Sequence, residues 1–151
     1  MPHALTILTN IRRDREGAEH QLRAILECHG RDLRSNPQLQ FHAMTTVHFA
    51  AWLILPQVGD RPARLLLETN YDGELSEHLD DLINHAAPAL DAIYALCEEY
   101  PGNARDNNSR ARVVEFFMRH RASTSAFFVG LPDRSVEDIR NAISVYEEAK
   151  E

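Results

Sequence analysis

Hydrophobic and polar residues alternate in four segments of this chain, which is the pattern of a strand with one buried face. Near the start, Leu5, Ile7 and Ile11 alternate with polar or small residues. After the turn residues Asn36 and Pro37, the chain is rich in β-branched and aromatic residues, which favour extended backbone. The predicted strands cover residues 4–11, 41–55, 64–71 and 124–131, and the second and third of them form a hairpin.

Apolar residues recur every three or four positions in the remaining segments, as they do in amphipathic helices. Helices are predicted at residues 15–29 and 75–97, from a cap at Ser109, and from a cap at Ser135. Pro88 is expected to break or kink the second helix, because proline has no N–H to donate. In the last helix Ser135 and Asp138 have the spacing of a capping box. The residues expected to form its buried edge are Val136, Ile139, Ile143 and Tyr146.

The element order β-α-β-β-α-α-β-α predicts an α+β domain of ferredoxin-like type, with a four-stranded antiparallel sheet in the order 4-1-3-2 and helices on one face. The 151 residues suffice for one domain with its own core, so residues 1–151 are expected to form a single domain.

Both faces of the predicted strand at 41–55 are apolar. One face carries Val47, Phe49, Leu53 and Leu55, and the other carries Met44, Thr46, His48, Ala50, Trp52 and Ile54. A face exposed to water should be polar, so a second copy of the sheet is expected to cover it. The pattern therefore predicts a homodimer, with the two sheets forming an α/β barrel.

Composition narrows the range of partners. The formal charge of -7 argues against nucleic acid, because that affinity comes largely from Lys and Arg. One region is basic. It is interpreted either as a solvated helix face or as a site for an anion, and the first interpretation is preferred because runs of charged residues usually form solvated faces. Its residues are Arg105, Arg110, Arg112, Arg119, His120 and Arg121.

No leader pattern or run of about 20 apolar residues occurs, so a cytoplasmic protein without membrane contact is expected. Cys28 and Cys97 are interpreted as buried small hydrophobic residues.

The candidate ligand-binding residues lie on the second face of the long strand. His48 and Trp52 share that face with Thr46 and His42, so polar groups would sit in an apolar chamber. The alternative is a hydrogen-bonded core histidine beside a packed tryptophan. His42 and His48 would be about 20 Å apart along a strand, too far to share a metal ion.

No catalytic or metal motif is present in the sequence. The acidic run at 68–74 could offer oxygen ligands to a hard cation, but turn chemistry and the helix start explain it better. No G-x-S-x-G, P-loop, G-x-G-x-x-G or H-E-x-x-H pattern occurs. No metal site and no catalytic residue is therefore assigned, and whether the chain is an enzyme stays open.

Three segments carry a resemblance: VHFAAW at 47–52, LLLETNYDG at 65–73 and ALDAIY at 89–94. With them the chain resembles uncharacterised bacterial proteins of the dimeric α+β barrel type. It is also similar in outline to the ferredoxin-like units of dye-decolourising peroxidases, chlorite dismutases and antibiotic-biosynthesis monooxygenases. The resemblance implies a barrel interior that binds haem or an aromatic substrate, with His48, Trp52 and Asn70 lining it.

Three functions follow from this sequence. The first is a homodimeric module that holds a small hydrophobic molecule, with His48 as polar anchor. The second is an oxidoreductase in the same chamber, either haem-dependent and peroxidase-like or a cofactor-independent monooxygenase. The third is a structural role without a cavity. The cofactor is not fixed by the residues, and haem is the candidate.

Overall fold

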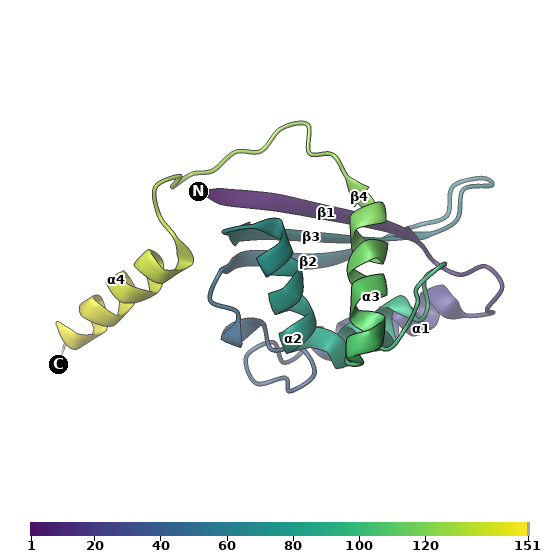
Figure 1. The fold of residues 1–151 in the computed structure, drawn as a ribbon, viewed down its shortest axis with the longest axis horizontal. Helices are drawn as coiled ribbons and strands as arrows, with labels where there is room; N and C mark the ends of the chain where they lie inside the picture. The colour runs from purple at the N-terminus through teal and green to yellow at the C-terminus, as the bar shows by residue number, and fades with distance from the viewer. Residues whose placement is uncertain (151) are drawn as a thin grey trace.

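Residues 1–150, the part of the chain described by a computed structural model, form four strands and four α-helices (Figure 1). The strands are β1 (Pro2–Asn10), β2 (Val47–Leu55), β3 (Arg64–Asp72) and β4 (Arg121–Ala122). The helices are α1 (Ala18–Gly30), α2 (Leu75–Tyr94), α3 (Asn107–Arg119) and α4 (Val136–Glu148), and a 3-10 turn covers Phe41–Ala43. The predicted α+β class is confirmed.

The strands form one antiparallel sheet in the order β2-β3-β1-β4, which is the order predicted. β1 and β3 pair along their full length, from Pro2 opposite Asp72 to Asn10 opposite Arg64. Helices α1, α2 and α3 cover one side of the sheet, and the linker from β4 to α4 passes beyond the edge of the sheet that β1 and β4 form (Figure 1). We call the side without helices the open face.

The core lies between the sheet and the three helices. β1 and β3 contribute alternate residues, among them Leu5, Ile7 and Leu67, all essentially inaccessible to water. The largest buried side chains of the helices are Tyr94, Phe116 and Phe117. Burying a side chain of this size stabilises the fold by about 2–3 kcal/mol, so the sheet is held mainly from the helical side.

α2 runs without interruption through Pro88, so of the predicted break or kink the break is wrong. Next to Pro88, the N–H of Ala89 and the carbonyl of His85 have hydrogen-bond partners in the segment at 38–40 instead of within the helix. The Ala89 N–H donates to the Gln38 carbonyl at 3.4 Å, and the Gln40 N–H donates to the His85 carbonyl at 3.0 Å. A loop distant in sequence therefore lets proline sit inside this helix.

The predicted last strand at 124–131 is wrong, because only Arg121 and Ala122 pair with β1. Phe127, Phe128 and Leu131 are exposed, and within residues 1–150 they have no strand to pair with.

The strand predicted from residue 41 begins at Val47, after the 3-10 turn. Asp106, rather than Ser109, caps α3. Cys97 is buried as predicted, but Cys28 is exposed on α1.

The Ser135–Asp138 capping box starts α4 as predicted. Its predicted buried edge is mostly wrong, since only Val136 is buried and the remaining three residues are exposed. The helix projects away from the rest of the chain (Figure 1). Within residues 1–150, no helix has the length and apolar character needed to cross a bilayer.

Candidate functional site

The open face combines apolar rows with a polar row between them. One row across the sheet is Leu53, Leu66 and Leu8, and another is Phe49, Asn70 and Ala4. The row between them is Ala51, Glu68 and Thr6. Phe49 is 49% and Leu53 is 47% exposed. The face is therefore an apolar surface with a few polar groups near its middle.

Asn70 is the polar residue on this face whose side chain lacks a hydrogen-bond partner. Its Nδ2 atom is buried and has no hydrogen-bond partner. A buried polar atom without a partner costs about 1–3 kcal/mol, and such atoms in folded proteins usually have a bound partner. Asn70 is therefore the residue of this face whose amide N–H lacks a partner within residues 1–150.

A β-bulge moves His48 out of the alternation of β2. Val47 pairs with Tyr71 and Phe49 pairs with Asn70, so His48 is the extra residue between them. The His48 Nε2–H donates to Asp72 Oδ1 at 2.9 Å. The prediction that His48 shares a face with Trp52 is wrong, because the bulge turns His48 toward the end of β3.

Asp72 joins three parts of the chain. Its Oδ1 accepts from His48, and its Oδ2 accepts from the Val136 N–H at 2.8 Å. Burial alone would raise the pKa of Asp72, but the hydrogen bonds from His48 and Val136 lower it below its usual value. The ionised carboxylate thus ties the bulge of β2 and the start of α4 to the end of β3.

Trp52 belongs to the covered side. Its indole N–H donates to the Tyr94 hydroxyl at 3.3 Å, and its ring centroid is 5.7 Å from that of Phe41. The alternative reading, a packed tryptophan, therefore describes Trp52, while His48 lies apart from it.

Thr46 and His42 lie near the end of the sheet where α4 begins. The Thr46 carbonyl accepts from the Asp72 N–H at 2.9 Å. His42 is exposed in the 3-10 turn, and its carbonyl accepts from Arg140 at 3.4 Å. The structure thus brings Thr46 and His48 together at Asp72, places Asn70 on the open face beside them, and separates all three from Trp52.

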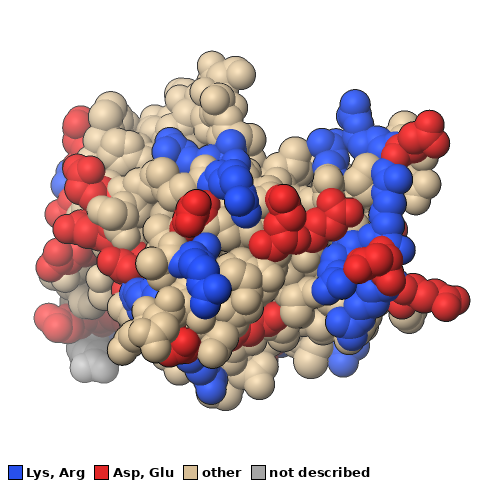
Figure 2. All heavy atoms as spheres, turned by 45° about the vertical axis from the view of Figure 1, so that its right-hand side comes forward, with Lys and Arg blue, Asp and Glu red and all other residues tan. Residues whose placement is uncertain are grey.

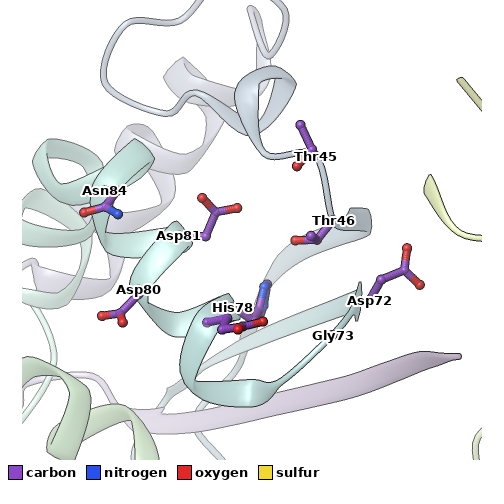
Figure 3. A pocket seen from close by; sticks show the side chains of 9 residues that line it. Thr45, Thr46, Asp72, Gly73, His78, Asp80, Asp81 and Asn84 are labelled. Carbon is purple, nitrogen blue, oxygen red and sulfur yellow. The ribbon is translucent and has the colours of Figure 1, made fainter. Parts of the chain in front are cut away.

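A groove lies on the other side of Asp72, with a volume of about 470 Å³. Thr45 and Thr46 face Asp80, Asp81 and Asn84 of α2 across it (Figure 3). Three of its four carboxylates have partners: Arg110 for Asp80 at 2.9 Å, His85 for Asp81 at 3.1 Å, and His48 for Asp72; the fourth is Glu77. Within residues 1–150, no group of three or more His, Cys, Asp or Glu side chains is placed to hold a metal ion.

His78, in the wall of this groove, was not singled out from the sequence. Its Nε2 lies 2.8 Å from Thr69 Oγ1, and its ring stacks on Tyr71 with the centroids 4.0 Å apart. Burial lowers its pKa to about 4. The available signal was its position three residues after Leu75, on the apolar side of α2.

The basic region around α3 behaves as a solvated helix face. Arg110 binds Asp80 and Asn84, and His120 lies 3.2 Å from Glu99. Acidic and basic side chains are interspersed over the surface that Figure 2 shows. No continuous basic surface is visible on that side.

Comparison with family models, with curated proteins and with solved structures finds no match. The function has to be argued from the geometry.

Proposed function

We propose that this chain is a homodimeric small-molecule-binding module of ferredoxin-like, α/β-barrel type. The open face of the sheet is one wall of a ligand chamber, and a second copy closes it. The observation that carries the proposal is the half-exposed apolar surface of Phe49 and Leu53. Contiguous apolar surface left open on a sheet marks a binding or association surface.

Two polar residues in adjacent rows, Asn70 and Glu68, define the class of ligand. Asn70 offers a buried amide N–H, and Glu68 offers a carboxylate one row away. A matching ligand has an apolar body, a carbonyl or ether oxygen for Asn70, and an N–H or O–H for Glu68. Such a chamber, apolar with a few fixed polar groups, is typical of small-molecule sites.

Haem fits this face poorly. Of the eight histidines, His48 is the one at the open face, and its Nε2 is engaged by Asp72. The other seven lie on helices or turns or, in the case of His3, beside Tyr71. Axial ligation by His48 would break the His48–Asp72 pair, so binding of an organic molecule without haem is the favoured function.

Dimerisation is tested by sedimentation velocity of the wild type, Leu53→Asp and Val58→Asp. Val58 is an exposed apolar residue of the β2–β3 loop, so it is the matched control. We expect a dimer for the wild type and Val58→Asp and a monomer for Leu53→Asp, because a carboxylate cannot be buried unpaired in the interface. A wild type that stays monomeric at tens of micromolar would overturn the proposal.

Ligand binding is tested with Nile red, an apolar dye with a carbonyl oxygen. We expect saturable fluorescence enhancement, lost in Leu53→Asp and weakened roughly 3- to 10-fold in Asn70→Leu, which is the range for one hydrogen bond. Haemin is titrated in parallel. A saturable Soret band that His48→Ala abolishes would replace this proposal with a haem protein.

A further inference from the structure

α4 is an amphipathic helix whose apolar side contacts little else in the described chain. Ile139, Ile143 and Tyr146 recur at helical spacing, and they are 38%, 52% and 61% exposed. A helix of 13 residues is marginal in water without packing against an apolar side. The stripe formed by these three residues therefore requires a surface to cover it.

The start of α4 is fixed at the end of its own sheet. The Val136 N–H binds Asp72, and Arg140 donates to the Met44 carbonyl at 3.3 Å. From this point the helix runs away from the strands (Figure 1). It cannot lie across its own open face while these contacts hold, so the stripe is directed to another molecule.

We propose that the α4 stripe of one copy packs on the open face of a second copy, and the reverse. This inference rests on the proposed homodimer, and it makes the partner's α4, in place of the second sheet of an α/β barrel, the element that closes the chamber. Each chain carries both an unpartnered apolar helix side and an unpartnered apolar sheet face. Reciprocal exchange covers the α4 stripe of each copy and the part of each open face that lies beneath it. One two-fold axis relates the two contacts, so the assembly is closed.

The dimensions of the two surfaces agree. β1, β2 and β3 each have nine residues, so the open face is roughly 30 Å long and about 15 Å wide. α4 is about 20 Å long, which fits within that length. In flat projection the helix, about 10 Å wide, covers roughly 200 Å² of the open face, so the two reciprocal contacts bury roughly 400 Å² on each copy, about half of the roughly 800 Å² that each partner of a standard dimer buries.

The packing also completes the proposed chamber. An α-helix packed on a sheet lies about 10 Å from it, so the stripe would contact Phe49 and Leu53 at one part of the face. Asn70 and Glu68 then line the space that the helix leaves beside these contacts. The partner's helix thereby becomes a wall of the ligand site.

The test is disulfide formation between two differently substituted chains. One chain carries Leu53→Cys and the other Ile143→Cys, both with Cys28→Ser, and Cys97 is buried. Mixed so that subunits exchange and then oxidised under native conditions, they should form the cross-link in the mixed dimers, which make up about half of all dimers. Glu148→Cys, on the opposite side of α4, replaces Ile143→Cys as the control and should form little.

A second arm measures the oligomeric state. Ile143→Asp should shift the dimer toward monomer at least tenfold, whereas Val145→Asp, exposed but outside the stripe, should leave the dimer unchanged. If the wild type is a dimer but Ile143→Asp has no effect and only Leu53→Cys cross-links to itself, the sheets meet directly. That result overturns the role of α4 and leaves the proposed function standing, whereas a monomeric wild type overturns both.

Discussion

His78 is a histidine that the fold keeps uncharged. It is 1% exposed, it shares a hydrogen bond with Thr69, and its ring lies flat on Tyr71. Burial penalises the imidazolium, which lowers the pKa of His78 to about 4. The unfolded chain binds this proton below about pH 6.5, whereas the folded chain binds it only near pH 4.

This difference predicts that acid destabilises the fold well above the carboxylate range. Between pH 7 and pH 5 the unfolded state takes up the proton and the folded state does not, so the free energy of unfolding falls by about 2 kcal/mol. Urea unfolding of wild type and His78→Phe at both pH values measures the effect. The phenyl ring keeps the stacking on Tyr71 but cannot titrate, so the variant should lose about 2 kcal/mol less. Equal losses in both proteins would contradict the assignment.

At the scale of elements, regular alternation located the strands that have one buried side. β1, α1 and β3 lie within a few residues of their predicted bounds, because their buried side chains follow the sequence period. The segment at 124–131 has the same alternation but no partner strand, so the pattern alone predicted a strand that does not form. Pro88 was misread for the opposite reason, since Gln38 and Gln40 supply bonds that no local pattern contains.

The candidate site was predictable to a similar extent. Asn70 follows the alternation of β3, so its position on the open face agrees with its sequence period. The sequence predicted His48 and Trp52 on the same face because strict alternation was assumed. A bulge adds one residue without changing the composition of the strand, so it could not be seen in the sequence. Asp72 was read as a turn residue, and its role as the junction of β2, β3 and α4 depends on contacts 24 and 64 residues away.

Asp72 therefore allows a prediction about α4. Asp72→Ala removes the acceptor for the Val136 N–H and leaves His48 without its partner. Hydrogen–deuterium exchange across 136–148 should become roughly tenfold faster or more, because a hydrogen bond to a charged group contributes about 1.5–3 kcal/mol. Asp133→Ala, in the exposed linker, is the control and should leave the exchange unchanged. Equal rates in the two variants would show that α4 is held elsewhere.

The whole molecule has one sheet with two unlike apolar faces. The covered face is filled by α1, α2 and α3, and Leu67 on it is inaccessible to water. The open face is also rich in leucine, yet Leu53 remains half exposed. Core packing explains the first set of side chains, and the proposed association and ligand binding would account for the second.

The two faces should respond differently to the same truncation. Leu67→Ala leaves a cavity in the core and should lower the free energy of unfolding by about 2–5 kcal/mol at every protein concentration. Leu53→Ala should lower the melting temperature mainly at high concentration, because the loss falls on the dimer rather than on the chain itself. Thermal melts over a hundredfold range of concentration separate the two cases. A wild-type melting temperature independent of concentration would mean that the open face contributes nothing to stability through self-association, and it would contradict the proposed homodimer.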